Sequence, residues 1–218
     1  MSESITLASV TMTLLGGFGT TVELFVLTLL FALPLGLLLS FGAMSRFAPL
    51  RGIVKTVVWI IRGTPLMLQI IVIFFGPGLL WDGDLLPRFT AALVAFVINY
   101  ACYFSEIFRG GIQSIPRGQQ EAGLVLCMTR SQIFFKVTLL QVIKRIVPPM
   151  GNEFITLVKD TSLAQAIGVV ELLRITENWV SSAVDMTPFL IAGIFYLVMN
   201  GIVTRCFTVA EKRLSYYR

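Results

Sequence analysis

The chain has 218 residues, of which 56% are hydrophobic and only 13% are charged. This composition is typical of membrane proteins and excludes an ordinary soluble globular domain. The net charge of +5 is weak support for nucleic-acid binding, because the basic residues lie beside apolar runs, where orientation in a membrane explains them. We therefore expect a lipid bilayer around the chain and no nucleic-acid partner.

The residue types present narrow the chemistry further. The chain contains no histidine, which excludes Ser-His and Cys-His hydrolases and HExxH metallopeptidases. Cys102, Cys127 and Cys206 show no CxxC spacing, so neither a zinc site nor a disulfide framework is indicated. We expect no catalytic residue, no metal and no cofactor bound by this chain.

The N-terminal residues 5–18 are apolar with interspersed Ser, Thr and Gly, and we expect them to form an interfacial helix along the outer membrane surface. Five later runs approach the roughly 20 residues that a spanning helix needs. Pro34 falls inside the first run as a tolerated kink, and Gly76-Pro77-Gly78 is expected to end the second. The fourth run is short and polar, and it is expected to begin at Pro148-Pro149, because proline suits a first helical turn. The predicted spans are residues 21–44, 53–75, 89–108, 149–164 and 187–207, in a single all-α membrane domain of residues 1–218.

The distribution of lysine and arginine predicts the orientation. Residues 1–45 contain neither, and the second connection contains only Arg88, so both are expected outside. The first connection, the loop 109–147 and the C-terminal tail are basic and are expected inside. Five spans with the N-terminus outside and the C-terminus inside satisfy every loop, and residues 167–180 become an outer surface segment. A four-span alternative would place the basic loop and the tail on opposite sides.

The loop 109–147 is too long and too well patterned for a simple turn. It carries six basic residues and a single acid, Glu121. Good helix formers occupy residues 119–128, and apolar residues at helical spacing occupy 133–146, so we expect a short helix followed by a longer one that leads into the fourth span. Ala122 and Gly123 leave a flat patch on the short helix, where a cytoplasmic partner could approach closely. The alternative is a loop that only connects two spans.

Charges inside the predicted spans suggest a binding site, because a charge in the bilayer usually faces a cavity or a partner. Glu153 and Asp160 lie seven residues apart with Thr156 between them, so the three share one helix face. Asn152, Thr156 and Lys159 form an adjacent strip.

The second predicted span contains a similar pattern, with Arg62 and Gln69 seven residues apart. Thr64-Pro65 is typical of a helix N-cap followed by a first-turn proline, which predicts a break within the span and a new helix start that can face an anion. Arg62 or the helix start at Thr64 would hold an amino-acid carboxylate, and Glu153 or Asp160 an ammonium group or a cationic side chain. The alternative is an Arg62–Glu153 or Lys159–Asp160 salt bridge that only fixes packing. Glu106 and the aromatic residues Tyr100 and Tyr103 are expected to be structural.

Several blocks of sequence resemble a known family. Gln120-Glu121-Ala122-Gly123, followed by Leu126-Cys127-Met128, resembles the "EAA" loop of ATP-binding-cassette (ABC) importer permeases. Four further blocks resemble the polar amino-acid branch of that family, which includes histidine, glutamine and arginine importers. They are Arg62-Gly-Thr-Pro-Leu, Ser105-Glu-Ile-Phe-Arg-Gly-Gly-Ile, Pro148-Pro-Met-Gly-Asn-Glu-Phe-Ile and Lys159-Asp-Thr-Ser-Leu.

The resemblance implies a type I importer permease in a bacterial cytoplasmic membrane, working by alternating access. Its implied partners are two ATPase subunits that bind the ATP and magnesium, a second permease chain, an extracytoplasmic amino-acid-binding protein and the amino acid itself. The coupling residues implied for this chain are Gln119, Gln120, Glu121, Ala122, Gly123, Leu126 and Cys127. The chain departs from the family pattern at Gly123 (usually Ala), at Cys127 (usually Gly) and at Leu139-Leu140 (usually Leu-Pro).

Three other functions share some of these features. An ion-gradient-driven amino-acid transporter would also have intramembrane carboxylates, although five spans without an internal repeat fit it poorly. An intramembrane enzyme would need a nucleophile and base that the sequence does not offer. A non-transporting assembly subunit would show no substrate-stimulated ATPase activity in its complex. The acids of the fourth span favour a cationic amino acid as the cargo.

Overall fold

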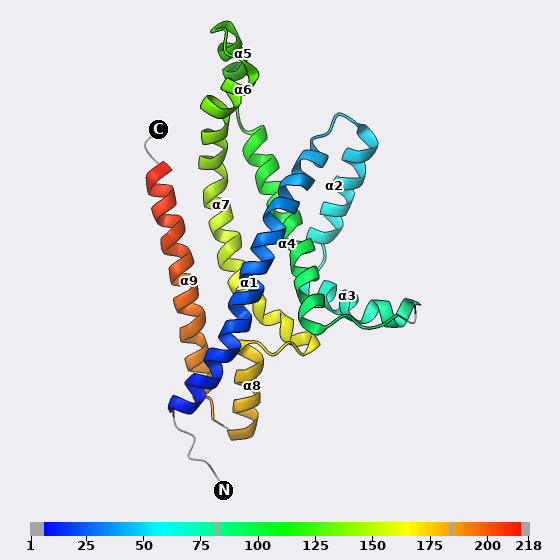
Figure 1. Cartoon of the computed structure of the whole chain (residues 1–218), viewed down its shortest axis with the longest axis vertical. Coiled ribbons are helices and arrows are strands. Elements are labelled where there is room, and N and C mark those ends of the chain that lie inside the picture. Colours follow the sequence, from blue (N-terminus) through cyan, green and yellow to red (C-terminus); the bar gives the residue numbers. More distant parts are fainter. Residues whose placement is uncertain (1–6, 82, 184, 215–218) are drawn as a thin grey trace.

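The computed structural model describes residues 7–81, 83–183 and 185–214, and these residues form helices and connections without a β-strand. Figure 1 shows the helices packed side by side along the long axis, with α3 turned across it. The elements are α1 (Leu7–Ala43), α2 (Ala48–Arg62), α3 (Leu66–Trp81), α4 (Arg88–Gln113), α5 (Arg117–Val125), α6 (Arg130–Ile133), the π-helical η1 (Phe134–Thr138), α7 (Leu139–Asp160), the 3-10 segment η2 (Thr161–Ile167), α8 (Leu172–Ala183) and α9 (Thr187–Leu214).

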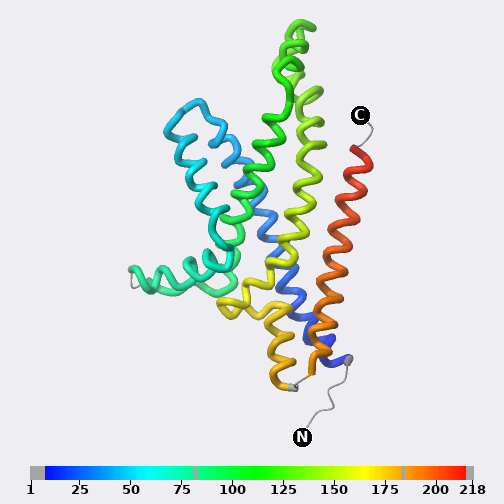
Figure 2. Tube along the Cα trace, turned by 180° about the vertical axis from the view of Figure 1, so that it is seen from behind, coloured from blue at the N-terminus to red at the C-terminus, as the bar shows by residue number. Residues whose placement is uncertain are grey.

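Three described helices, α1, α4 and α9, are long and apolar enough to cross a membrane. The α2–α3 pair is a fourth candidate if its two helices, bent by 105°, count as one broken span. α7 carries too many charged and polar residues to qualify by composition, although it runs beside α4 and α9 (Figure 2). Length and composition therefore support three or four of the five predicted spans.

The N-terminal prediction of a separate interfacial helix is wrong. From Leu7 the chain forms one continuous helix with the first predicted span, and residues 5 and 6 of the predicted segment lie outside the described part. Val10 and Leu14 are buried against Leu172 and Ala192, which belong to α8 and α9. Because the buried contacts of α1 extend this far, its first turns are held against the bundle and do not lie separately on the membrane surface.

The second predicted span breaks where the Thr64-Pro65 pattern placed the break, between α2 and α3. Thr64 is not an N-cap, however: its hydroxyl donates back to the Ile60 and Ile61 carbonyl oxygens at the end of α2. The predicted end at Gly76-Pro77-Gly78 is also wrong, because α3 continues to Trp81 with Pro77 inside it.

The fourth predicted span differs at both ends. α7 begins at Leu139, so the longer helix predicted over residues 133–146 does lead into the span, but Pro148 and Pro149 lie in the interior of α7 and not in a first helical turn as expected. It ends at Asp160, and the chain tightens there into η2. Proline inside a helix removes a hydrogen bond, a loss that neighbouring helices can offset, and α7 packs between α4 and α9. Residues 167–180, predicted as a surface segment, include the fully buried Glu171 and Leu172.

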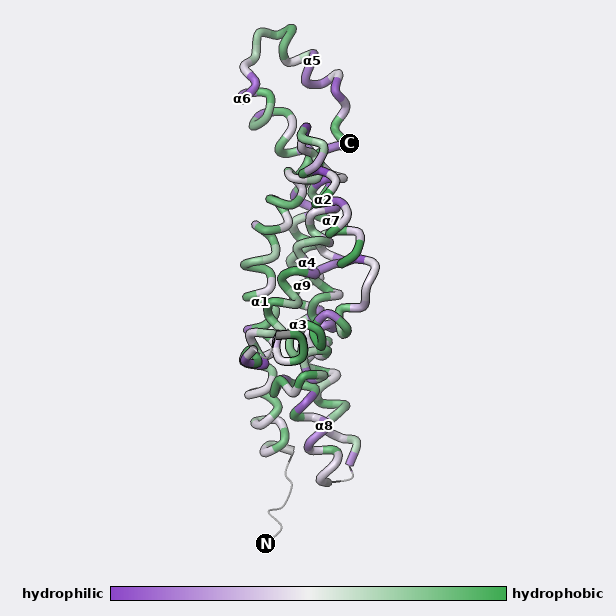
Figure 3. The backbone as a smooth tube through the Cα atoms, turned by 90° about the vertical axis from the view of Figure 1, so that its right-hand side faces the viewer, coloured by the Kyte–Doolittle hydropathy of each residue, from purple (hydrophilic) through white to green (hydrophobic). Residues whose placement is uncertain are grey.

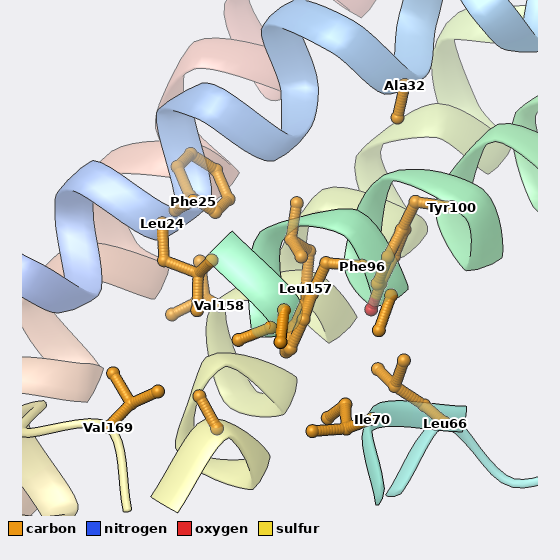
Figure 4. Close-up of a cluster of buried hydrophobic side chains, with 14 of the residues drawn as sticks. Leu24, Phe25, Ala32, Leu66, Ile70, Phe96, Tyr100, Leu157, Val158 and Val169 are labelled. Carbon is orange, nitrogen blue, oxygen red and sulfur yellow. The ribbon is translucent and has the colours of Figure 1, made fainter. Parts of the chain in front are cut away.

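The main core lies where α1, α4 and α7 meet (Figure 4), and it includes Leu24, Phe96, Tyr100, Leu157 and Val158. α1 and α4 approach so closely at Gly36 that a Cβ atom there would lie 2.9 Å from the Ala101 carbonyl oxygen and from Phe104 Cβ. The closely packed pair α1–α4 is the element against which α7 and the α2–α3 break are placed.

The two ends of the molecule differ. α5, α6, the α1–α2 connection and the C-terminal end of α9 lie at one end, called the α5 end below, and α8 with the start of α1 lies at the other (Figures 1 and 2). Figure 3 shows hydrophobic residues along α1 and α3 and hydrophilic ones on α5 and α8. Polar segments thus mark both ends of an apolar bundle.

Candidate functional site

A cavity of about 380 Å³ lies at the level of the α2–α3 break, and we call it the central pocket. It is bounded by the start of α3, by α4 and by α7. Its lining residues are Thr64, Pro65, Leu66, Asn99, Tyr100, Tyr103, Glu153, Thr156, Asp160 and Leu163.

The α7 side of the central pocket confirms the spacing argument. Glu153, Thr156 and Asp160 all line it, as residues on one helix face must. The Tyr100 hydroxyl donates to Asp160 Oδ2 at 2.7 Å, which holds that carboxylate against α4. Thr156 donates back to the Asn152 carbonyl oxygen at 3.0 Å, so its hydroxyl oxygen remains available as an acceptor.

The α2–α3 break forms the opposite wall, and Gln69 holds it in place. Gln69 Nε2 donates to the Ile61 carbonyl oxygen (2.8 Å) and to Thr64 Oγ1 (2.9 Å), while Asn99 Nδ2 donates to Gln69 Oε1 (3.1 Å). This network ties the break to α4. The first turn of α3 borders the pocket through Pro65 and Leu66, so the positive end of that helix dipole lies at the pocket wall.

The other predicted ligands lie apart from the central pocket. Arg62, Gln69, Asn152 and Lys159 are not among its lining residues. Gln69 is buried within the break, whereas Asn152 and Lys159 are exposed on α7. Their predicted role in substrate binding remains a prediction.

Three lining residues of α4 went unrecognised in the sequence: Asn99, Tyr100 and Tyr103. The two tyrosines were expected to be structural, since tyrosine in an apolar span commonly packs. Asn99 was the available signal, because an amide inside an apolar run needs a hydrogen-bonding partner.

A second cavity, of about 410 Å³, adjoins the central pocket on the side of α5, and we call it the inner cleft. Tyr103 and Glu153 line both cavities. The remaining lining residues of the inner cleft are Arg62, Glu106, Ile107, Gly110, Gly111, Ser114, Arg145 and Pro149.

Arg62 lies in the inner cleft and does not pair with Glu153 in the way the packing alternative proposed. Its Nη1 is 3.8 Å from Glu106 Oε2, and its guanidinium carbon is 5.0 Å from the centre of the Tyr103 ring. Glu106 also accepts a hydrogen bond from Arg109 Nε at 3.0 Å. The predicted Lys159–Asp160 bridge is likewise not among the ion pairs between described residues. Asp160 instead accepts a hydrogen bond from the Tyr100 hydroxyl.

A third cavity, of about 370 Å³, lies on the side of α8. It shares Leu163 with the central pocket and is bordered by Arg174 and Glu177 of α8. The central pocket therefore lies between two other cavities: the inner cleft on the side of α5 and this third cavity on the side of α8.

The short helix of the basic loop is α5, Arg117–Val125, which lies within three residues of the predicted 119–128 at each end. Gln120, Glu121 and Ala122 are exposed on it, and so are Leu126 and Cys127 just after it. Gly123 is buried, because a Cβ there would lie 2.7 Å from Ile133 Cγ1, so it packs against α6 and does not form part of a flat outer patch as predicted. Gln141 Nε2 donates to Gln119 Oε1 at 2.7 Å, which ties α5 to α7.

Comparison with known proteins is consistent with this geometry. Residues 32–216 match the family described as "Binding-protein-dependent transport system inner membrane component". The chain is 36% identical over 205 residues to the L-cystine transport system permease protein TcyB of Bacillus subtilis (93% of this chain, 86% of the relative). It is 34% identical to the arginine transport system permease protein ArtQ of Bacillus subtilis (93% and 92%). It is 32% identical to the glutamine transport system permease protein GlnP of Escherichia coli (93% of each chain).

Solved structures agree in fold. A chain from a crystal structure of an amino acid ABC transporter with histidines superposes with a TM-score of 0.86 at 31% identity, covering 98% of this chain and all of the other. The inward-facing MetNI methionine ABC transporter superposes with a TM-score of 0.72 at 18% identity, which supports the fold alone. Sequence over most of the chain and fold over nearly all of it lead to one conclusion: the protein belongs to the family of inner membrane components of binding-protein-dependent transport systems.

Proposed function

We propose that the chain is the translocating permease of an ATP-driven importer of polar amino acids, and that the central pocket binds the amino acid. The observation that carries the proposal is the pocket itself. Two carboxylates, Glu153 and Asp160, lie across from a helix start at Pro65. An amino acid has the complementary groups, an ammonium for the acids and a carboxylate for the helix start.

The lining of the pocket favours a cationic amino acid. Among its ten lining residues are two acids and no lysine or arginine. A neutral amino acid would neutralise at most one negative charge through its ammonium group, whereas arginine or lysine supplies a second cation. Relatives named for arginine, glutamine and cystine transport show that neighbouring members differ in cargo.

We further propose five crossings, with α2–α3 as a broken second span and α7 as the fourth. The basic α5 region, Arg46 in the α1–α2 connection and the end of α9 lie together at one end in Figure 1. The positive-inside rule assigns that end to the cytoplasm. The N-terminus and α8 then face the outside, where a substrate-binding protein would deliver its cargo.

The exposed surface of α5 and the residues just after it is the proposed docking site for the ATPase. Helices α5 and α6 form a hairpin, the α5–α6 hairpin (residues 117–133). Leu124, Val125 and Leu126 are more than half exposed at its tip, and Glu121 is exposed nearby. Apolar residues presented this way suit insertion into a groove of another protein. The chain contains no GxxxxGK[ST] motif, so ATP binding and hydrolysis fall to the partner subunits, and a second permease chain completes the complex.

The test is reconstitution of the whole complex with its binding protein. We expect ATP-dependent uptake and ATPase stimulation by one or more basic amino acids when a panel of amino acids is compared. Uptake driven by an imposed proton or sodium gradient in ATP-free vesicles would instead identify a secondary transporter. An ATPase rate unaffected by every amino acid would indicate an assembly subunit.

A further inference from the structure

The central pocket and the inner cleft form one track along two antiparallel helices. From Asn99 to Ser114 the cavities follow α4 for roughly 22 Å, at 1.5 Å per residue. α7 borders the same track in reverse, from Asp160 in the pocket to Arg145 in the cleft. The track therefore leads from the middle of the molecule toward the α5 end (Figure 1).

The charge of the lining changes along this track. The central pocket has two acids and no base, whereas the inner cleft has Arg62 and Arg145 beside Glu106 and Glu153. A cationic group held in the pocket meets two guanidinium groups in the cleft, so its binding weakens as it moves. The inner cleft thus suits transit of a cationic amino acid better than tight binding of it.

Arg62 lies at the junction of the two cavities. It is the last residue of α2, directly before the break, and its guanidinium lies over Tyr103, the aromatic ring that both cavities share. Its ion pair with Glu106 is long, at 3.8 Å, and its side chain is 41% exposed. A half-exposed ion pair and a cation–π contact at an exposed site are both weak interactions, so both are easily broken and remade.

Alternating access, which the proposed function implies, requires a passage from the central pocket toward the ATPase side, and the inner cleft supplies it. We propose, on the basis of that function, that Arg62 is the gate residue between the central pocket and the inner cleft. Held against Tyr103 and Glu106, Arg62 closes the end of the passage that meets the pocket. Release of that contact, with a change of angle at the α2–α3 break, opens it.

Gly110 offers a direct way to block the passage. It lines the inner cleft, and a Cβ atom added there would meet nothing within 4 Å. The adjacent Gly111 instead packs against α7, where a Cβ would collide with Ile146 Cγ2. A side chain at Gly110 therefore enters the cleft without disturbing the packing of α4 on α7.

The passage is tested with Gly110→Cys in a complex whose Cys102, Cys127 and Cys206 are replaced by alanine. The purified complex is treated with a cationic methanethiosulfonate, reconstituted, and assayed for uptake of L-arginine and L-glutamine. We expect modification to reduce uptake by about 10-fold or more, while Gly52→Cys, at an equally open glycine of α2, is modified without loss. Complete modification at residue 110 with normal uptake would overturn the passage.

The gate is tested by the rate at which the same reagent modifies Thr156→Cys in inverted membrane vesicles, which expose the ATPase side. Arg62→Ala should raise this rate by about 10-fold, whereas Arg46→Ala, which removes an exposed arginine of the α1–α2 connection, should not. Equal rates with and without Arg62 would overturn its role as gate. The labelling rate does not depend on which solute is carried, so it tests the gate alone. Unchanged uptake in Asp160→Asn would count against the proposed substrate site and would leave the gate result standing.

Discussion

Asp160 is the residue on which the proposed selectivity depends most. It lines the central pocket and is tethered by the Tyr100 hydroxyl at 2.7 Å, so its carboxylate is positioned before any substrate arrives. Pre-positioning lowers the ordering cost of binding, which makes the loss of this charge more costly than the loss of a mobile one.

We expect Asp160→Asn to weaken uptake of a cationic amino acid by about 10-fold or more, because asparagine keeps the shape and removes the charge. Glu153→Gln should act in the same direction. The measurement is the concentration dependence of uptake by the reconstituted complex, with Glu211→Gln on the exposed end of α9 as the matched loss of an acid outside the site. Unchanged uptake in both pocket variants would remove the acids from the substrate site.

Glu171 illustrates a different use of a buried acid at the residue scale. It is fully buried before α8, where its carboxylate accepts the Leu173 and Arg174 backbone N–H groups at 2.8 and 2.6 Å. The Tyr196 hydroxyl of α9 also donates to it, at 3.3 Å. Burial nevertheless raises the pKa of Glu171 from the ordinary 4.5 to about 7.

A raised pKa in the folded protein means that folding favours the protonated form. The stability from this group is therefore fully present below about pH 4.5 and is lost as the pH rises toward 7, by an amount on the order of 3 kcal/mol. We expect the melting temperature of the purified protein to fall between pH 5 and pH 8, and Glu171→Gln to reduce that fall. An identical pH dependence in the variant would assign the fall to other groups.

At the scale of elements, two of the three departures from the family pattern, Gly123 and Cys127, lie in the α5–α6 hairpin (residues 117–133), and the structure shows what the second one costs. Cys127 has a φ of 56°, the left-handed conformation that glycine adopts freely and other residues adopt at a cost. The backbone at residue 127 therefore adopts the left-handed conformation that suits glycine, although the residue is cysteine. Thr129 then starts α6 with a capping box to Gln132, which helps hold the strained turn.

We expect Cys127→Gly to stabilise the hairpin by about 1 kcal/mol and Cys127→Val to destabilise it by a similar or larger amount. Hydrogen exchange of the amides around residues 123–133 in the purified complex would measure both effects. Cys206→Gly serves as the control, because it introduces a glycine at an exposed helical position with no left-handed backbone to favour it. Faster exchange in Cys127→Gly would contradict the strain argument.

At the scale of the whole molecule, the prediction concerns orientation. A fluorescent reporter that matures only in the cytoplasm, fused after Arg218, should be active. An alkaline phosphatase inserted at Asp185, in the exposed connection before α9, should be active outside. A fluorescent C-terminal fusion together with an inactive phosphatase at Asp185 would place both positions in the cytoplasm. That result would contradict a crossing by α9 and the topology proposed here.

The sequence by itself determined the class of the protein, the two-helix form of the basic loop and the family. Those features depend on local composition and on ordered blocks such as Arg62-Gly-Thr-Pro-Leu. It also placed Glu153, Thr156 and Asp160 on one face, because helical periodicity acts within a single element. The break after Arg62 could also be predicted, because the effect of Thr64-Pro65 on the backbone is local.

Only the tertiary structure decided which elements meet. The Asn99 and Tyr100 side of the pocket, the pairing of Arg62 with Glu106, and the extension of α1 to Leu7 all depend on contacts between distant segments. The prolines of α7 were misread for the same reason, because their tolerance depends on α4 and α9 packing on either side. Periodicity and turn chemistry are properties of neighbours along the chain, whereas pockets and ion pairs are properties of neighbours in space.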